Sequence, residues 1–274
     1  MKQYNPTTPS RRHMTTVDYG GLSDVRPLKS LVAKQSKQSG RNNQGRITMR
    51  HQGGGNKRLY RLVDFKQQTL NVPAKVETLE YDPFRTAFIA RIVYANGKRS
   101  YILATNSMKI GDILMFSEKA PIKDGNRMLL INIPVGYMVH NIELTPGKGG
   151  QIIRSAGTYA EILAHDSGYT TLKMPSGEVR KVLANNFASL GSLSNPDYAL
   201  TTGGKAGHTR WLGVRPTVRG SAMNPVDHPY GGGEGKAQRG TKRPKTLWGK
   251  ITGGRRTRNK NKWSGRLIVS RRKK

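Results

Sequence analysis

The chain has 274 residues and carries 48 Lys and Arg against 16 Asp and Glu, a formal net charge of +32. This is about four times the upper end of the charge of roughly 2–8 that suits a small soluble domain, so a polyanionic partner is expected. The absence of cysteine excludes disulfides, thiolate metal sites and a cysteine nucleophile. The first residues lack the apolar segment of a signal peptide, and no run approaches the ~18 apolar residues of a membrane span.

The positive charge is concentrated at the two ends. Residues 59–196 have 16 basic and 11 acidic side chains, a net charge of +5, and 39 of these 138 residues are Leu, Ile, Val or Phe. Residues 1–58 have a net charge of +10 and residues 197–274 of +17, with few of those apolar residues. The middle can bury a core that the ends cannot build alone. We therefore predict two small folded domains, at 59–122 and 123–196, between two basic extensions.

The middle predicts short strands separated by turn signals. In chain order, they are expected at 76–81, 87–94, 99–104, 112–116, 129–133, 138–144, 160–165, 169–174 and 178–183. Asn96 and Gly97 join two of these runs and predict a hairpin with a type I′ turn, and residues 166–168 predict a second hairpin. Short strands at this spacing are typical of small barrels or sandwiches, and no window predicts a long amphipathic helix.

The two ends mix Gly, Arg, Lys and Asn with little periodicity. All three tryptophans, Trp211, Trp248 and Trp263, lie in the basic C-terminal part. Indole rings among basic residues can stack on bases or sugars of a nucleic acid. The alternative is that each ring anchors the C-terminal extension onto the folded domains, and the sequence leaves both interpretations open.

Three glycine clusters also point to a polyanion. They lie at 53–55, 147–150 and 231–233, each beside a lysine. Backbone N–H groups of such loops can bind phosphate, and the adjacent lysines favour this interpretation over a flexible turn. The lysines are Lys57, Lys148 and Lys236.

Enzyme signatures are weak. The chain has no P-loop, dinucleotide-binding or nucleophile-elbow motif, and its six histidines are not spaced as a local metal site. Asp227 and His228, with Glu234 nearby, form the one cluster that suggests acid–base chemistry. A histidine beside proline in a glycine-rich loop is more often structural or in contact with RNA.

Long motifs along the chain give the sequence a family likeness. They are GRNNQGRITMRHQGGGNKRLYRLVDFK (40–66), LEYDPFR (79–85), NIPVG (132–136), VHNIEL (139–144), PGKGGQ (146–151), RSAGTYA (154–160), SGEVRKV (176–182) and KAGHTRWLGVRPTVRGSAMNPVDHPYGGGEGKA (205–237). With these motifs the chain resembles the large-subunit ribosomal protein L2 family, of the bacterial type, nearly from end to end.

The resemblance implies a mostly β protein in which an OB-fold barrel is followed by an SH3-like barrel, with long, basic, irregular extensions at both ends. It implies a non-enzymatic structural protein that binds large-subunit rRNA as a primary binder and supports assembly of the peptidyl-transferase centre, tRNA binding and subunit association. The expected partners are large-subunit rRNA, neighbouring ribosomal proteins and small-subunit rRNA at an intersubunit contact. No membrane, homo-oligomer, protein-held metal or cofactor is expected apart from Mg²⁺ associated with the rRNA. The expected location is the ribosome, with the bacterial cytosol favoured over an organelle.

The resemblance also implies roles for single residues. Arg85 and Arg154 match positions associated with rRNA binding, and His228 matches a histidine tied to peptidyl-transferase activity of the whole ribosome. The full set of expected rRNA contacts is Arg85, Arg154, Lys57, Arg58, Lys148, Arg210, Trp211, Arg215, Arg219, His228, Lys236, Trp248, Arg255, Arg256 and Arg258. Two positions depart from the family pattern, because Tyr230 and Asn56 stand where the family usually has histidine.

Two other functions fit part of the sequence. A free nucleic-acid-binding or nucleoid-like protein would share the charge, and an RNA-directed enzyme would use His228 with Asp227. Neither explains a two-domain core with basic ends together with the family likeness.

Overall fold

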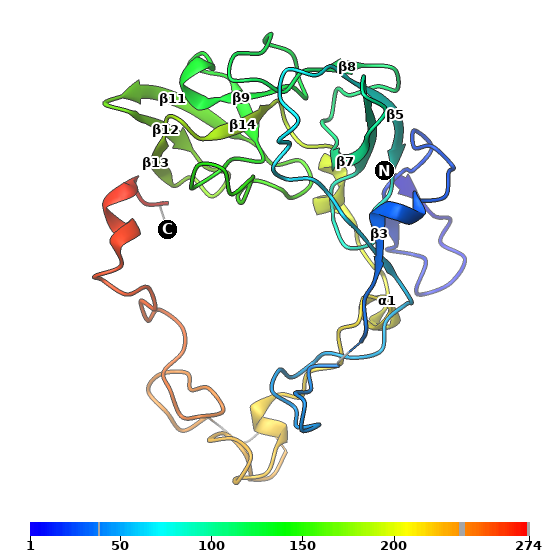
Figure 1. The fold of residues 1–274 in the computed structure, drawn as a ribbon. Coiled ribbons are helices and arrows are strands. Elements are labelled where there is room, and N and C mark those ends of the chain that lie inside the picture. Colours follow the sequence, from blue (N-terminus) through cyan, green and yellow to red (C-terminus); the bar gives the residue numbers. More distant parts are fainter. Residues whose placement is uncertain (38, 236–238, 273–274) are drawn as a thin grey trace. The chain divides into compact units, whose positions relative to one another are not determined.

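The structure is a computed structural model that describes residues 1–37, 39–235 and 239–272 (Figure 1). The chain divides into two compact units. Unit 1 consists of Met1–Ser36, Lys57–Ala206 and Arg266–Lys274, and unit 2 of Lys37–Asn56 and Gly207–Gly265. The chain therefore leaves unit 1 twice and returns to it twice.

Unit 1 contains two main antiparallel sheets (Figure 1). The first has the order β7-β6-β5-β8 and is built from β5 (Ala74–Glu80), β6 (Ile89–Tyr94), β7 (Arg99–Leu103) and β8 (Ile113–Leu114). In β5 every second side chain is buried, because alternate residues of a strand face the core. The core of this sheet includes Val76, Ile92, Tyr94 and Phe116.

The turn between β6 and β7 differs from the predicted type I′ turn. Gly97 has a φ of 80°, but Asn96 does not have positive φ. The Gly97 N–H donates to the carbonyl of Tyr94, and the Tyr94 N–H donates to the carbonyl of Lys98. The loop is thus one residue longer than predicted and closes on a left-handed glycine, which is the next most common hairpin geometry.

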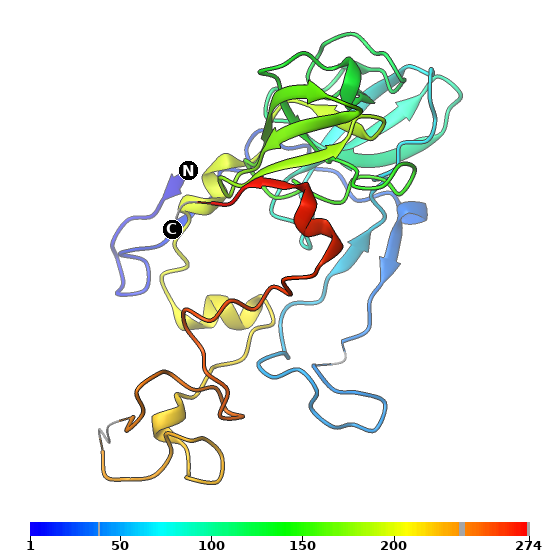
Figure 2. The same ribbon diagram turned by 90° about the vertical axis from the view of Figure 1, so that its left-hand side faces the viewer.

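The second sheet has the order β15-β13-β12-β11-β10-β14-β9. Its strands are β9 (Arg127–Leu129), β10 (Met138–His140), β11 (Ala160–Asp166), β12 (Tyr169–Lys173), β13 (Val179–Leu183), β14 (Phe187–Leu190) and β15 (Ile268–Ser270). β15 lies near the end of the chain and pairs with β13, so the C-terminal segment returns to this sheet (Figure 2). Met128, Ile162, Leu172 and Leu190 belong to its core.

The prediction of a strand at 129–133 in this sheet is mostly wrong. Strand β9 ends at Leu129, and the chain continues as a 3-10 helix, η2 (Leu130–Asn132). Leu130 and Ile133 are buried whereas Ile131 is exposed. The buried side chains are three residues apart, which matches the repeat of a 3-10 helix and not the alternation of a strand.

The remaining elements are short. Two small antiparallel pairs join β1 (Lys2–Gln3) to β2 (Thr15–Thr16) and β3 (Val32–Lys34) to β4 (Leu59–Arg61). The helices are η1 (Lys29–Leu31), η3 (Pro196–Leu200), α1 (Ala206–Trp211), η4 (Gly220–Ala222) and η5 (Trp263–Leu267). Over the described residues, no helix has the length and apolar character needed to cross a bilayer.

The two main sheets of unit 1 are joined by hydrogen bonds between their connecting segments. The Phe88 N–H donates to the Ser194 hydroxyl at 3.1 Å, and the Asn195 side-chain amide donates to the carbonyl of Thr86 at 2.7 Å. The Gly150 N–H donates to the carbonyl of Phe65 at 2.9 Å. The last of these bonds fixes the segments around Phe65 and Gly150 against each other.

A buried histidine makes the stability of unit 1 depend on pH. His140 lies in β10 with its Nδ1 2.8 Å from the carbonyl of Gly191, and burial lowers its pKa to about 4. In the unfolded chain a histidine has a pKa near 6.5. Between these values the unfolded state binds the proton and the folded state does not, so stability is lost as the pH falls from about 6.5 to about 4.

At about 1.4 kcal/mol per pH unit, this histidine alone should destabilise unit 1 by about 3 kcal/mol at pH 4 relative to pH 7. Urea unfolding followed by near-ultraviolet circular dichroism of tyrosine measures the effect. His140→Gln keeps a donor for the Gly191 carbonyl but does not titrate, so its stability should fall less over the same range. Equal losses in both proteins would contradict the prediction.

Candidate nucleic-acid interface

Three arginines and three aromatic rings form one continuous series of contacts on unit 1. In spatial order this arginine–aromatic row consists of Arg58, Phe84, Tyr60, Arg85, Phe65 and Arg154. The row draws its members from three stretches of the chain, 58–65, 84–85 and the segment of Arg154, and the bond between Gly150 and Phe65 holds the first and third together. Guanidinium groups over aromatic faces are attracted by the ring quadrupole, which gives each arginine a fixed position.

The contacts within the row are close. The guanidinium carbon of Arg154 lies 4.4 Å from the Phe65 ring centre, and that of Arg85 lies 5.0 Å from the same ring. Arg85 is also 5.6 Å from the ring of Tyr60. At the other end, Tyr60 meets Phe84 edge to face at 5.5 Å, and Arg58 lies 4.4 Å over Phe84.

The arginines of the row differ in how their charge is balanced. Arg85 Nε lies 3.0 Å from the carboxylate of Asp82, which is fully buried. Arg58 and Arg154 instead donate to the backbone carbonyls of Pro83 and Gly150. Within the described part of the chain neither of these two has a carboxylate within 4.0 Å. Their charges are therefore free to meet a phosphate.

The glycine loop at 146–150 borders the row. A Cβ atom on Gly149 would lie 3.0 Å from the carbonyl oxygen of Phe65, and its φ of 82° also favours glycine. Lys148 is exposed in this loop. The close approach of the loop to Phe65 places the Lys148 backbone beside the end of the row that carries Arg154.

A buried ion pair holds the same loop from inside. Arg127 and Glu143 are both buried, and Arg127 Nη2 lies 3.1 Å from Glu143 Oε1. Burial lowers the pKa of Arg127, and the neighbouring Glu143 partly offsets this. The Glu143 carboxylate also accepts the N–H groups of Gly149 at 3.0 Å and Gly147 at 3.4 Å. The loop is thus tied to a charge in the core while Lys148 points outward.

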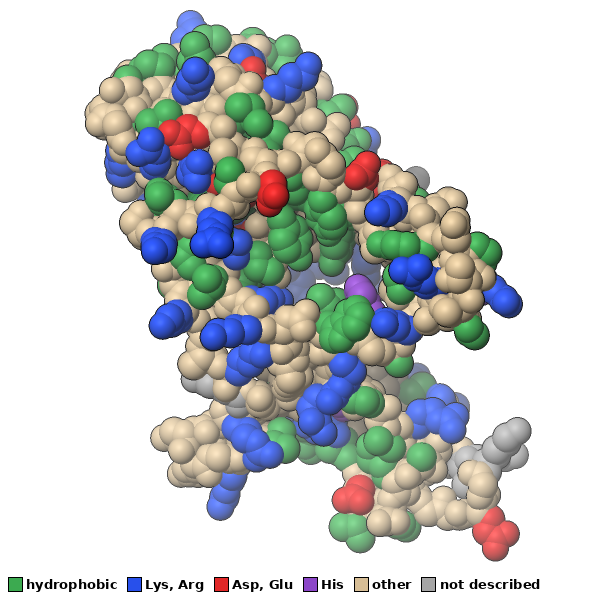
Figure 3. Space-filling model, turned by 90° about the vertical axis from the view of Figure 1, so that its right-hand side faces the viewer, with side chains coloured by type: hydrophobic (Ala, Val, Ile, Leu, Met, Phe, Trp, Pro, Cys, Tyr) green, Lys and Arg blue, Asp and Glu red, His purple; other side chains and the backbone are tan. Residues whose placement is uncertain are grey.

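Unit 2 is basic and has no core of its own. From the sequence, its two segments hold 18 basic and 2 acidic residues, a net charge of +16. Among its described residues, Ser264 alone is buried. The space-filling view in Figure 3 shows many Lys and Arg side chains and few acidic ones on the surface it presents. A segment of this kind needs a polyanion both to balance its charge and to order it.

The first glycine cluster serves backbone packing in unit 2. The Gly53 N–H donates to the carbonyl of Gly213, and the Asn56 N–H donates to the carbonyl of Trp211. A Cβ atom on Gly55 would lie 2.9 Å from the Cα of Gly213. The Gly53 N–H is therefore engaged within the protein, and phosphate contact by the rest of this cluster stays a prediction.

Trp248 lies in the tight loop of a small hairpin in unit 2. Lys245 and Ile251 form a bridge, and the Thr246 N–H donates to the carbonyl of Lys250. The Trp248 side chain is 73% exposed, and the Arg50 guanidinium lies 5.8 Å from its ring. Trp263 is also largely exposed. Exposed rings of this kind offer stacking surfaces to a nucleic acid.

His228 is held by its own loop. Its Nδ1 accepts the N–H of Tyr230 at 3.0 Å, and a Cβ atom on Gly220 would lie about 2.5 Å from the imidazole ring. The Tyr230 hydroxyl accepts the Lys245 N–H and a hydrogen bond from Thr241. Tyr230, which departs from the family pattern, thus joins the His228 loop to the hairpin of Trp248.

The other predicted contacts are spread over the surface. The side chains of Arg210, Arg215, Arg219, Arg255 and Arg256 are exposed, as are those of Lys57 and Trp211. Arg258 donates to the hydroxyl of Ser264 at 3.0 Å. Lys236 lies outside the described residues. In the described part, no group of three or more His, Asp or Glu side chains is arranged to hold a metal ion.

Two family models match most of the chain. The model of the RNA binding N-terminal domain of Ribosomal Proteins L2 matches residues 28–116, and that of the C-terminal domain of the same proteins matches residues 123–249. The chain belongs to the ribosomal protein L2 family.

Membership in the L2 family confirms the predicted fold class. The chain is mostly β, and its two curled sheets agree with an OB-fold followed by an SH3-like fold. Sequence reasoning named the three arginines of the row but missed the rings that hold them. The basic and aromatic residues that interleave over 57–66 were a signal that Tyr60 and Phe65 belong to the same surface.

Glu143→Gln should destabilise unit 1 of this L2-family chain by about 3–5 kcal/mol, because it leaves the buried Arg127 charge without a counterion. Urea unfolding measures the loss. Trypsin should also cut faster after Lys148, since the carboxylate that binds the loop is gone.

Glu161→Gln is the matched control, because Glu161 pairs with Lys173 at 3.3 Å on the exposed surface. An exposed pair of this kind contributes about 0–1 kcal/mol. Similar effects of the two substitutions would show that the buried pair does not hold the loop.

Proposed function

We propose that this L2-family chain is a structural constituent of the large ribosomal subunit that binds rRNA directly through the arginine–aromatic row and unit 2. The observation that carries the proposal is the pair Arg58 and Arg154, each stacked on a ring and neither balanced by a carboxylate in the described structure. Arginine is suited to phosphate because its planar fork donates two parallel hydrogen bonds.

Stacking prepares these arginines for binding. A free arginine side chain loses rotamer entropy when it binds, whereas one already fixed on a ring loses less. Arg85 is balanced by Asp82 and packs between Phe65 and Tyr60. It supports the row from within, while the two ends of the row meet phosphates.

Unit 2 supplies the larger share of the electrostatic affinity. Each phosphate that it neutralises releases condensed counterions, so binding weakens steeply as salt is added. Its exposed tryptophans can stack on unpaired bases, which gives contacts that do not depend on charge. The rRNA then provides the order that a segment without a core cannot provide itself.

The family likeness supports the finer parts of the proposal. They are primary binding to large-subunit rRNA, support for the peptidyl-transferase centre and tRNA binding, subunit association, contacts with neighbouring ribosomal proteins and with small-subunit rRNA, and residence in the bacterial cytosol. Mg²⁺ would be held by the rRNA. The proposed role of His228 is to shape its loop beside the rRNA, because its Nδ1 is occupied by the Tyr230 N–H.

Arg154→Gln should weaken binding to large-subunit rRNA and make the slope of log affinity against log salt less steep by about 1, since one phosphate contact is lost. Filter binding of the full chain to the rRNA over a salt series measures both quantities. Lys173→Gln is the control, because Lys173 is basic and exposed but already paired with Glu161.

A competition assay separates this function from that of a free nucleic-acid-binding protein. Large-subunit rRNA should displace the chain from bulk duplex RNA at fixed salt, and small-subunit rRNA should do so less well. Equal competition by all three nucleic acids, or unchanged slopes in Arg154→Gln, would contradict the proposal.

A further inference from the structure

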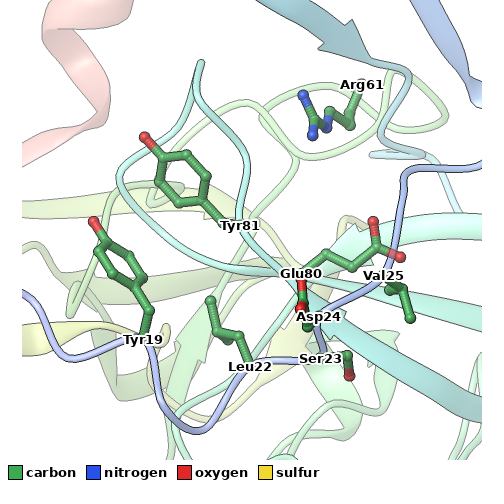
Figure 4. A pocket seen from close by; sticks show the side chains of 8 residues that line it. All are labelled: Tyr19, Leu22, Ser23, Asp24, Val25, Arg61, Glu80 and Tyr81. Atoms are coloured by element: carbon green, nitrogen blue, oxygen red, sulfur yellow. The ribbon is translucent and has the colours of Figure 1, made fainter.

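A pocket of about 620 Å³ opens on unit 1 next to the row (Figure 4). Its walls come from the segment 19–25, from β4, and from the end of β5 with the residue after it. The side chains that line it are Tyr19, Leu22, Ser23, Asp24, Val25, Arg61, Glu80 and Tyr81. None of the residues expected from the sequence to contact RNA lies in this pocket.

Two tyrosine rings form an aromatic wall. Tyr19 and Tyr81 meet at a centre-to-centre distance of 5.4 Å with an interplanar angle of 73°. About half of each side chain is exposed, and both hydroxyl groups point the same way in Figure 4. The exposed aromatic surface is apolar in its body and polar at its tip, a combination that suits a nucleobase.

The wall rests on fixed backbone. The Ser23 N–H donates to the carbonyl of Leu79 at 2.8 Å, and the Leu79 N–H lies 3.3 Å from the Ser23 hydroxyl. The segment that carries Tyr19 is thereby attached to β5, the strand that leads to Tyr81. The two rings are therefore positioned before any ligand arrives.

Three charged side chains line the pocket, the exposed Asp24, Glu80 and Arg61, and Arg61 is the one that can meet an anionic group of a ligand. Glu80 is already satisfied, because it accepts hydroxyl groups of Thr78 and Tyr101 at 2.8 Å each and pairs with Arg91 at 3.4 Å. Arg61 donates from Nη1 to a backbone carbonyl, while its buried Nε has no hydrogen-bond partner in the structure. The Arg61 guanidinium points toward the side of the pocket where Tyr81 lies (Figure 4).

We propose that this pocket binds one unpaired nucleotide of the rRNA, with its base against Tyr19 and Tyr81 and its phosphate beside Arg61. The proposal rests on the rRNA-binding function above. An Arg85 nitrogen donates to the Arg61 carbonyl at 3.5 Å, so the residue that supplies the pocket's cation is bonded through its backbone to the row. In the proposed complex, an RNA strand whose phosphates meet the row also places one nucleotide in the pocket. A cationic peptide could pair with Asp24, but Glu80 is already paired with Arg91 and Arg61 would repel such a peptide.

Ultraviolet crosslinking of the full chain to large-subunit rRNA tests the pocket directly. After nuclease and protease digestion, mass spectrometry should find nucleotide adducts on Tyr19 or Tyr81. Adducts on the row and on unit 2 without any on these two tyrosines would overturn the proposal. So would a crosslink in assembled subunits that joins either tyrosine to a peptide of another ribosomal protein.

Substitutions at Tyr81 give an independent measurement. Tyr81→Leu removes the ring but stays apolar, and the affinity for rRNA should fall about tenfold, as for the loss of one stacked base. Tyr81→Phe keeps the ring and should bind as the parent chain does. Because no charge changes, the salt slope should be the same in all three proteins. Near-ultraviolet circular dichroism of tyrosine checks that each variant is folded.

The two proposals fail in different ways. If Tyr81→Leu binds as tightly as the parent while Arg154→Gln still has a shallower salt slope, the nucleotide pocket is wrong and the row stands. If the parent chain shows no preference for large-subunit rRNA, the proposed function itself is wrong.

Discussion

Unit 2 places a net charge of +16 on two segments that bury no apolar side chain among the described residues. Folding requires apolar burial to offset the loss of chain entropy, and like charges oppose compaction. The described residues of these segments meet neither requirement. Unit 1 has to meet this constraint for the whole chain. It supplies the apolar core, and it holds the chain at both ends of each charged segment. The pairing of β15 with β13 anchors the chain where the longer segment ends.

The arginines of unit 1 occur in two environments, a buried ion pair and a surface row of aromatic rings. Arg127 is buried and paired with Glu143. The same Glu143 carboxylate accepts N–H groups of the glycine loop, so the ion pair holds that loop in place. Arg58 and Arg154 lie at the surface on aromatic rings, and their charge is not cancelled by a carboxylate in the described structure. A buried charge needs a counterion within the protein. An arginine stacked on a ring at the surface needs none, so it can bind an anion from another molecule. The same residue type thus gives internal rigidity in one place and external binding in another.

The sequence predicted the parts of the fold that depend on local pattern. Alternating residues and turn signals placed β5, β6, β7, β11, β12 and β13, because each hairpin is specified by neighbouring residues. β14 was missed, since Ala188 and Ser189 weaken its pattern, and β15 was missed because its partner lies far away in the chain. The row could be predicted only in part. Motifs pointed to its arginines, but its rings meet them through tertiary contacts that no local spacing encodes.

Charge alone cannot fix how a protein sits on rRNA. Phosphates repeat along every strand, so electrostatic contacts give affinity that salt weakens but little preference for one register. A base that stacks on an aromatic ring occupies one defined site, and its contribution to the binding free energy does not depend on released counterions. In the complex proposed above, the row binds an RNA backbone and the pocket lined by Tyr19 and Tyr81 takes one base. A strand held in both ways at once would keep one register, because moving it by one nucleotide would remove the base from the pocket, and stacking would thereby add a defined position to the general attraction of charge.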